Sequence, residues 1–419
     1  MRSYSVYLIL AAAGLAACGG GESTAPPKPA SITISPPATI NGTVNGLVQP
    51  SPTFTVLDDK GAALGNIAVS VTVSAGGGTL TSPATKSNNG ATSVGTWILG
   101  PNPGLNTLTV AVAGLAPVTI TADAHSAFFV DLRYAGVAID PSFKTAFAAA
   151  KARIESIITA DLQDAQVTNL DVAGCPGAVS GMPALTEIID DLIVYAVVDS
   201  IDGPGKILGS SGPCYTRTAG GLSLIGFMHF DVADFQGLKN DGRLNDVVLH
   251  EMLHVVGFGT LWVSKGQVTG NGTNSPLFIG AQAVAGCIFH GGTAANQCGG
   301  NSVPLETTGG QGTRDVHWRE TTSATGIGFR TELMTGFVSA VGIANPLSRI
   351  SIGSLGDMGY TVNVTLNDPY TVPSTAAVSL GLIRDAQGID TSFQLNDLVL
   401  EPIGSVDATG RVTPIKKKP

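Results

Sequence analysis

The stretch NDVVLHEMLHVVGFG, Asn245 to Gly259, is the most informative part of this sequence. Its histidines, His250 and His254, are four residues apart, and Glu251 directly follows the first. Residues at this spacing project from one face of an α-helix, so both imidazoles can bind a single cation. Glu251 is offset around the helix, where it can reach a metal-bound water without being a ligand. The stretch therefore predicts a helix that carries a catalytic zinc site.

The alternative is that these three polar residues are satisfied inside a helical core without any metal. The remainder of the helix reads VVL, ML and VV, which is the composition of a buried element. Burying three ionisable side chains without partners would cost several kcal/mol. A zinc ion removes this cost, so we favour zinc as the cofactor and Glu251 as the group that activates the water.

A catalytic zinc also needs a third protein ligand and an open coordination position. Four further histidines are available, namely His125, His229, His290 and His317. His229 follows a strand pattern and His290 lies in a glycine-rich loop, so a structural or surface role explains both more simply. A glutamate ligand is conceivable as well, and the first glutamate after His254 is Glu306.

Three segments together resemble the leishmanolysin-type metzincin peptidases. HEMLHVVG keeps their HExxHxxG pattern, but Thr260 stands where an ordinary metzincin has its third histidine. TRDVHWRE (residues 313–320) and TELMTGF (residues 331–337) resemble, in order and wording, the segments that follow a long insertion in the leishmanolysin type. The resemblance covers residues 125 to 362, and it implies an α+β metzincin-type zinc protease domain there.

The resemblance also implies roles for single residues. His317 would be the third zinc ligand, and Met334 the Met-turn residue beneath the metal. Gly257 would end the helix and turn the chain back under the zinc. Glu332 and Arg319 are candidates to brace the site from outside the ligand shell.

The N-terminus predicts export. A short apolar run ends in LAAC, Leu15 to Cys18, which resembles a bacterial lipobox with Cys18 as the lipidated residue. Residues 1–18 would be the lipoprotein signal peptide, and residues 19–30, GGGESTAPPKPA, a flexible tether. The lipid would anchor the chain to a membrane of the bacterial cell envelope, in the periplasm or at the surface. An ordinary signal peptide with an incidental cysteine is the alternative.

The remaining cysteines fit an exported protein. Cys175, Cys214, Cys287 and Cys298 form an even set without CxxC spacing, which favours disulfides over a metal site. Three pairings are possible, and Cys175–Cys214 with Cys287–Cys298 is the most local.

Residues 31–124 contain seven short β-type runs separated by Gly, Pro and Asn. They predict an all-β sandwich that resembles bacterial immunoglobulin-like domains, and a spacer role explains it best. After residue 125 the order is strand, long helix from Pro141 with Asp140 as N-cap, strands, and the HEMLH helix, which is α+β. Residues 363–419 form a C-terminal extension of weak, partly β-type pattern, either a small β appendage or a tail packed on the protease domain. The fold class is therefore multidomain.

These features favour a zinc endopeptidase acting on extracellular or periplasmic proteins. The strand GLSLIGFMHF, residues 221–230, would bind an extended peptide if it forms the sheet edge above the zinc. A surface adhesin whose protease domain is only a scaffold is the main alternative, and a zinc hydrolase of another bond also stays open. The net charge of −9 comes without a basic stripe, so nucleic-acid binding has no electrostatic support.

Overall fold

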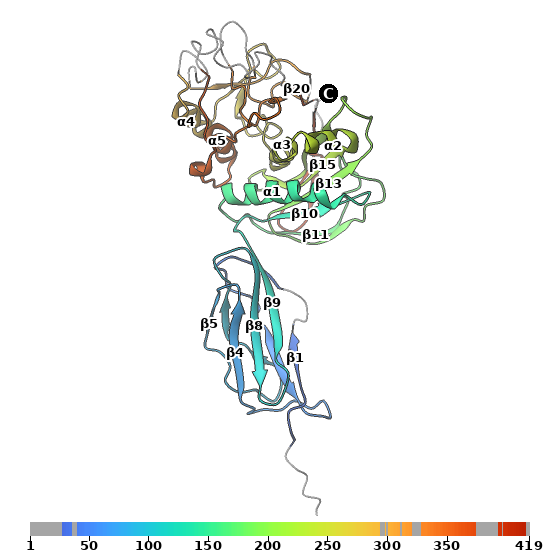
Figure 1. Ribbon diagram of the computed structural model, residues 1–419, viewed down its shortest axis with the longest axis vertical. Coiled ribbons are helices and arrows are strands. Elements are labelled where there is room, and N and C mark those ends of the chain that lie inside the picture. Colours follow the sequence, from blue (N-terminus) through green and yellow to red (C-terminus); the bar gives the residue numbers. More distant parts are fainter. Residues whose placement is uncertain are drawn as a thin grey trace, which may run out of the picture. The chain divides into compact units, whose positions relative to one another are not determined.

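The computed structural model describes residues 27–35, 40–293, 298, 301–310, 312–320, 328–373, 393–395 and 397–415. The signal peptide, Cys18 and most of the tether lie outside the described residues. The chain forms two compact units, residues 1–124 and 125–419 (Figure 1). The prediction of a multidomain chain, rich in β-sheet with some helices, is confirmed. Among the described residues, no helix has both the length and the apolar character needed to cross a membrane.

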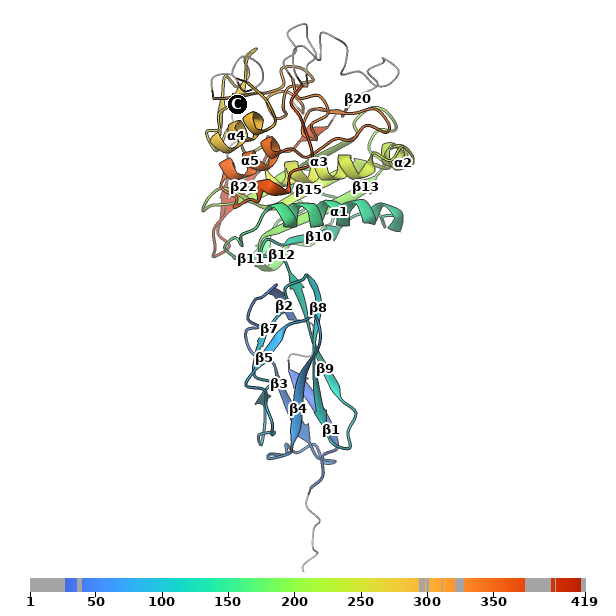
Figure 2. The same cartoon turned by 60° about the vertical axis from the view of Figure 1, so that its left-hand side comes forward.

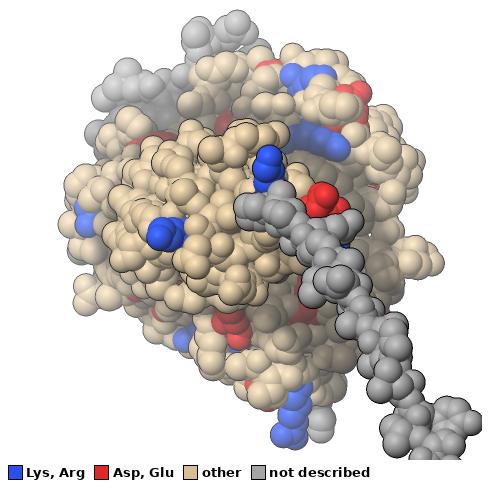
Figure 3. Space-filling model, turned by 90° about the horizontal axis from the view of Figure 1, so that it is seen from below, with Lys and Arg blue, Asp and Glu red and all other residues tan. Residues whose placement is uncertain are grey.

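The first unit is built of strands alone. Its strands are β1 (Ser31–Ser35), β2 (Ile40–Thr43), β3 (Thr53–Leu57), β4 (Val69–Ala75), β5 (Thr79–Thr81), β6 (Thr92–Ser93), β7 (Thr96–Ile98), β8 (Gly104–Val112) and β9 (Val118–His125). Sheets β1-β3-β6 and β2-β9-β8-β4 share one core, in which Phe54, Leu108 and Ile120 are buried. Burial alternates along β8 because successive side chains point to opposite faces. Figure 3, viewed from below, shows only a few scattered charged side chains on this face of the molecule.

The second unit contains the helices. Up to and including α3, which carries the HEMLH residues, its elements are β10 (Val130–Tyr134), α1 (Pro141–Ile157), β11 (Ala165–Leu170), β12 (Leu185–Ile189), β13 (Leu192–Asp199), β14 (Gly209–Arg217), β15 (Ser223–Asp231), α2 (Val232–Asn240) and α3 (Leu244–Val256). Beyond it are β16 (Val268–Thr269), β17 (Leu277–Phe278), α4 (Ala281–Phe289), β18 (Val303–Pro304), β19 (Phe337–Val338), α5 (Arg349–Met358), the 3-10 helix η1 (Val364–Leu366), β20 (Phe393–Gln394), β21 (Leu398–Val399), β22 (Gly404–Val406) and β23 (Val412–Pro414).

A mixed sheet organises this unit, with the order β10-β13-β15-β14-β22-β23 and β21 also paired to β14. Strand β13 is buried on both faces, because Val194 and Ala196 face one apolar cluster and Ile193 and Tyr195 face another. Helices α1 and α3 lie side by side over the first of these faces (Figures 1 and 2). The second face is covered by β11, β12 and the segment between them. The sheet is therefore a rigid support for α3.

Helix α1 begins where the sequence indicates. Asp140 accepts a hydrogen bond from the Ser142 backbone N–H at 2.8 Å, and Pro141 occupies the first turn, where its missing N–H costs nothing. Phe143, Phe147 and Ile154 recur at helical spacing and are buried against the sheet and α3. This packing fixes the flank of α3 that faces α1.

Two hypotheses about this unit can be compared with the sheet. Residues 221–230, proposed to bind a peptide on the condition that they form the sheet edge, correspond to β15, which lies between β13 and β14 and has no free edge. Residues 363–419, interpreted from sequence as either a β appendage or a tail packed on the preceding domain, belong to the second compact unit, as the second interpretation requires. Within them β21 and β22 pair in parallel with β14, so the C-terminal segment completes the sheet. Their short runs of two or three residues left no periodicity to read.

Both disulfides follow the most local pairing, Cys175–Cys214 and Cys287–Cys298. The first joins the segment between β11 and β12 to β14, and the second joins α4 to the loop that follows it. The prediction of disulfides among these cysteines is confirmed.

Candidate metal centre

Helix α3 brings the HEMLH residues into the interior. His250, Glu251 and His254 are each fully buried, although all three side chains are ionisable. The helix ends at Gly257, whose φ of 117° is the left-handed conformation that glycine adopts without strain. The chain then turns so that the Phe258 carbonyl accepts a hydrogen bond from His254 Nδ1 at 2.9 Å. The glycine thus fixes the orientation of the second histidine.

Three imidazoles converge on one point. The Nε2 atoms of His250 and His317 are 2.9 Å apart, those of His254 and His317 are 2.9 Å apart, and those of His250 and His254 are 3.0 Å apart. His317 is also fully buried and comes from the loop after β18, 63 residues beyond His254. Sequence spacing alone could not have joined it to α3.

Backbone carbonyls determine which ring nitrogens carry hydrogen. Nδ1 of His250 lies 2.8 Å from the Leu333 carbonyl, and Nδ1 of His317 lies 3.1 Å from the Thr313 carbonyl. A carbonyl oxygen only accepts, so each Nδ1 must donate, as does that of His254. In the neutral rings every Nε2 is then an acceptor with its lone pair directed at the other two. Three such lone pairs cannot hydrogen-bond to one another, and a shared cation resolves the conflict.

Electrostatics keep these rings neutral. Burial, together with the other two histidines, holds the pKa of His250 well below its usual value. Burial lowers the pKa of His254 to about 4, with a further contribution from His317. Burial likewise lowers the pKa of His317 to about 4. At neutral pH the Nε2 lone pairs are therefore free to bind a metal ion.

Glu251 lies beside the histidines, and only one of its two carboxylate oxygens has a hydrogen-bond partner among the described residues. Ser211 on β14 donates its hydroxyl hydrogen to Glu251 Oε2 at 2.5 Å, whereas Oε1 accepts no hydrogen bond from any described residue. Burial raises the pKa of Glu251 well above its usual value, helped by the charge of Asp397 and opposed by Ser211. A carboxyl group with a raised pKa and a free oxygen is suited to take a proton from water and return it.

The turn around Met334 supports the first histidine. Buried Glu332 accepts from the Met334 backbone N–H at 2.6 Å and from the hydroxyls of Ser348 and Ser351 at 2.7 and 2.6 Å. This fixes the carbonyl of Leu333, which binds His250. Met334 itself is fully buried, and its carbonyl accepts from the backbone N–H of the residue after His317.

A fourth residue, which the sequence did not indicate, completes the group. Oδ2 of Asp397 lies 3.5 Å from His317 Nε2, 3.6 Å from His254 Nε2 and 4.0 Å from His250 Nε2. The residue is almost fully buried, and neither carboxylate oxygen accepts a hydrogen bond from a described residue. The surrounding sequence LNDLVL, residues 395–400, carries no metal-binding pattern. Asp397 also follows His317 by 80 positions, so no spacing rule points to it.

The donor set fits zinc. Zinc in proteins takes four ligands, with Zn–N bonds of about 2.0–2.1 Å. The Nε2 atoms of His250, His254 and His317 are close enough for one point to lie at that distance from all three. Each Nδ1 is held by a carbonyl, which is the usual outer support of a metal-binding imidazole. Buried oxygens without partners on Glu251 and Asp397 give a second sign that a cation and water belong here.

The other candidates have structural roles. His290 accepts from the Arg349 backbone N–H at 3.0 Å and lies 2.9 Å from the Tyr370 carbonyl. His229 pairs with Asp199 at 2.6 Å, near the surface. Three further residues are used locally: His125 contacts the Ser126 carbonyl, Glu306 accepts from the backbone of residues 307, 308 and 320, and Arg319 donates to the Leu305 carbonyl. None of these residues belongs to the cluster formed by His250, His254 and His317.

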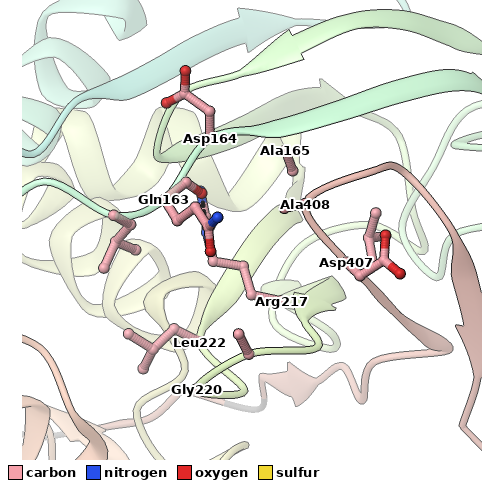
Figure 4. A pocket seen from close by; sticks show the side chains of 11 residues that line it. Gln163, Asp164, Ala165, Arg217, Gly220, Leu222, Asp407 and Ala408 are labelled. Carbon is pink, nitrogen blue, oxygen red and sulfur yellow. Dashed lines mark hydrogen bonds between the residues drawn. The ribbon is translucent and has the colours of Figure 1, made fainter.

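Two cavities differ in their relation to this centre. An open cavity of about 600 Å³ is lined by Gly259, Val316 and Val399, which are close in sequence to the helix end, His317 and Asp397. A smaller cavity of about 180 Å³ surrounds Arg217 (Figure 4). The guanidinium of Arg217 donates to the carbonyls of Gln163 and Ser223, among others, so it joins backbone segments and needs no ligand.

Comparison with known proteins leaves the family open. No family model matches the chain, and no curated protein matches it significantly. Domains 4 and 5 of the S-layer protein SbsC are 19% identical over 24% of this chain and 53% of that chain, with a TM-score of 0.18. The D00-D0 domain of Intimin is 16% identical over 24% of this chain and 48% of that chain, with a TM-score of 0.17. A Bacteroides ovatus GH5 xyloglucanase is 9% identical over 52% of this chain and 44% of that chain, with a TM-score of 0.18. Scores this low carry no argument about fold or function, and this chain spans about half of the S-layer fragment.

Proposed function

We propose that the second unit is a zinc-dependent endopeptidase similar to the leishmanolysin-type metzincins. The observation that carries the proposal is the convergence of three Nε2 lone pairs within 3.0 Å of one another, with the free oxygen of Glu251 on the same helix. A histidine triad with an adjacent carboxylate is the minimal equipment of a metal-assisted peptide hydrolase.

In this mechanism His250, His254 and His317 hold the ion. Zinc would supply acidity to a water molecule and polarise the substrate carbonyl. Glu251 takes the proton from the water as its oxygen attacks the carbonyl carbon, and then passes that proton to the leaving amine nitrogen as the C–N bond breaks. Ser211 orients the carboxylate through Oε2, so that Oε1 faces the water. The open cavity lined by Val316, which precedes His317 in the chain, would offer room for a substrate side chain.

The proposed setting is the bacterial cell envelope. Two disulfides suit an oxidising compartment. A lipid on Cys18 would anchor the chain, and the first unit, similar in sequence pattern to immunoglobulin-like domains, would hold the peptidase away from the membrane. Its substrates would be extracellular or periplasmic proteins or peptides.

The deciding experiment measures zinc content and cleavage of unfolded casein in parallel. We expect one zinc per wild-type chain, unchanged zinc in Glu251→Ala and loss of cleavage in that variant. Asp397→Asn and the double variant Glu251→Ala/Asp397→Asn are also prepared, because the Asp397 carboxylate lies against the histidines. His229→Ala is the control histidine outside the centre. Cleavage that survives in Glu251→Ala would refute the assigned role.

The same experiment separates the alternatives. A surface-binding protein with a scaffold domain predicts no cleavage in either background, even with zinc bound. A hydrolase of another bond predicts bound zinc and a Glu251-dependent activity on an ester or amide substrate, with casein left intact.

A further inference from the structure

We infer that Asp397 is the fourth ligand of the metal centre and that it holds the described form of the chain inactive. This inference rests on the proposed function. It concerns a residue of the C-terminal segment, defined here as residues 393–395 and 397–406, which lies well after the sequence segments that resemble a peptidase.

The distances place Oδ2 of Asp397 at the free corner of a tetrahedral site. It lies 3.5–4.0 Å from the three Nε2 atoms, which are 2.9–3.0 Å from one another. From these six distances, a single point lies about 2.1 Å from all four atoms, which is the bond length of zinc to imidazole nitrogen or carboxylate oxygen. One metal ion can therefore bind the carboxylate and the three histidines together.

Asp397 has no other use for its charge. Its side chain is 1% exposed, and no described residue donates a hydrogen bond to either oxygen. Burying a carboxylate without hydrogen bonds or a cation is costly, so the fold needs a reason to keep it there. Coordination to a metal supplies that reason.

The C-terminal segment is held on both sides of the centre. Before Asp397, β20 pairs with β19, and the backbone N–H of Leu395 donates to the carbonyl of Gly336, just after the Met334 turn. Beyond Asp397, β21 pairs with β14, and the N–H of Leu400 donates to the carbonyl of Ser211 at 2.7 Å. Ser211 is also the residue that binds Glu251. The segment therefore crosses from the support of His250 to the support of the catalytic carboxylate.

Two glycines leave room for this crossing. A Cβ at Gly312 would lie 1.8 Å from the carbonyl oxygen of Asp397, and a Cβ at Gly212 would lie 2.3 Å from that of Leu400. Any other residue would force the segment away from the centre. The backbone on both sides is thus shaped to accept it.

Coordination by Asp397 has two consequences for activity. It fills the position that an open catalytic site reserves for water and substrate. In addition, β21 and β22 occupy the outer side of β14, where an extended peptide could otherwise add to the sheet. Hydrolysis therefore requires Asp397 to leave the metal.

The test compares full-length wild type with Asp397→Asn, which keeps the shape of the side chain and removes the anionic ligand. Asp407→Asn is the matched control, because it makes the same substitution in a carboxylate one residue beyond the segment, where it accepts from the backbone N–H groups of Thr409 and Arg411. The probe is acetohydroxamate, a small ligand of zinc, with binding measured by calorimetry on zinc-loaded protein. If the free position is available in about 1% of wild-type molecules, Asp397→Asn should bind the probe about 100-fold more tightly. The Asp407→Asn control should match wild type.

Two further measurements complete the test. Zinc affinity should fall in Asp397→Asn by at least the roughly 10–100-fold that outer supports of metal ligands contribute. Casein cleavage should rise in the same variant, and circular dichroism should show that its fold is retained. Gly312→Ala, which changes no ligand residue, should also increase probe binding, because its Cβ displaces the segment that carries Asp397.

The outcomes separate this inference from the proposed function. Equal probe affinity in wild type and Asp397→Asn, or slower cleavage by Asp397→Asn, would overturn the inhibitory role and leave the zinc peptidase intact. Absence of zinc from wild type would overturn the proposed function itself. Tighter probe binding without cleavage would support Asp397 as the fourth ligand and would leave a binding protein or another hydrolase as the function.

Discussion

Two clusters of possible metal ligands in the second unit differ in an instructive way. The metal centre joins His250, His254, His317 and Asp397, and an acidic cluster joins Asp161, Asp190 and Asp191. In each cluster the ligand atoms lie within 4.8 Å of one another. Proximity alone would therefore rank them as equals.

Hydrogen bonding distinguishes them. In the acidic cluster the buried member, Asp191, accepts from the backbone N–H groups of Phe129 and Leu162, each at 2.7 Å. Both of its oxygens are thus occupied by the fold, and Asp161 is exposed to solvent. In the candidate metal centre, by contrast, the Asp397 oxygens have no hydrogen-bond partner among the described residues, and the Nε2 atoms of the neutral rings face one another as acceptors. Convergent acceptors without donors, rather than nearness, indicate a cation site.

The charge state differs in the same sense. Burial lowers the pKa values of the histidines, which leaves neutral rings with free lone pairs. Burial raises the pKa of Asp191 to about 7, and the pKa values of Asp190 and Asp161 are also raised, chiefly by burial. In the acidic cluster a proton relieves the crowded charge. In the candidate metal centre the lone pairs of three neutral rings face one another, and a bound cation would relieve that conflict.

The largest difference in zinc content and in unfolding temperature should appear when one ligand candidate is removed from each cluster. We expect His317→Ala to lose the zinc, whereas Asp190→Ala should keep one zinc per chain. A metal present at about 1,000 times its dissociation constant stabilises the fold by about 4 kcal/mol, so His317→Ala should lower the unfolding midpoint by about 10 °C. Metal analysis and calorimetry with and without a chelator measure both effects. A zinc loss in Asp190→Ala, or none in His317→Ala, would reverse the comparison.

Local signals in the sequence predicted the part of the candidate centre that lies on one helix. His250, Glu251 and Gly257 are linked by helical spacing and by the backbone need for glycine, which are read within a few residues. The α1 boundary at Asp140 was readable for the same reason. His317 needed a resemblance to a known segment, because nothing in its own surroundings indicates a ligand. The most local disulfide pairing was correct because short loops cost least to close.

Long-range pairing was not readable. Asp397 lies between two strands of two residues each, too short for any alternation to appear. The condition that β15 forms the sheet edge is not met, and it could not be checked from sequence because the strand that covers β15, β14, has the sequence GSSGPCYTR, with little β-branched character. Ser211 in that strand resembles any loop serine, and only its position opposite α3 makes it the partner of Glu251. These relations depend on tertiary contacts that leave no periodicity in the sequence.

A smaller effect is expected at Glu332, a satisfied buried carboxylate beside the centre. In Glu332→Gln one carboxylate oxygen becomes an amide nitrogen, which cannot accept the hydrogen bond from the Met334 backbone at one position or those from the Ser348 and Ser351 hydroxyls at the other. We therefore expect a loss of about 1–3 kcal/mol in unfolding free energy. Zinc affinity should also fall, because the Leu333 carbonyl that orients His250 loses its support. Chemical denaturation and competition with a zinc chelator measure the two losses.

Asp231→Asn is the matched control for Glu332→Gln. Asp231 is also buried and accepts from the backbone N–H groups of Ile201, Asp202 and Ala233, but it caps α2 and makes no hydrogen bond to the turn that supports His250. We expect a comparable loss of stability with zinc affinity unchanged. Equal zinc affinity in both variants would show that the Glu332 network contributes only to stability.

The smallest expected effect is a pH dependence that belongs to the acidic cluster. Because burial raises the pKa of Asp191 to about 7, the folded chain binds a proton that the unfolded chain releases near pH 4. The unfolding free energy should therefore fall as the pH rises from about 4 to about 7, by at most about 1.4 kcal/mol per pH unit. Asp191→Asn, which cannot titrate, should flatten this decline in urea unfolding at pH 5 to 8. If millimolar calcium instead stabilises wild type but not Asp191→Asn at pH 8, the acidic cluster also binds a cation. Occupied oxygens would then no longer distinguish a structural carboxylate from a ligand.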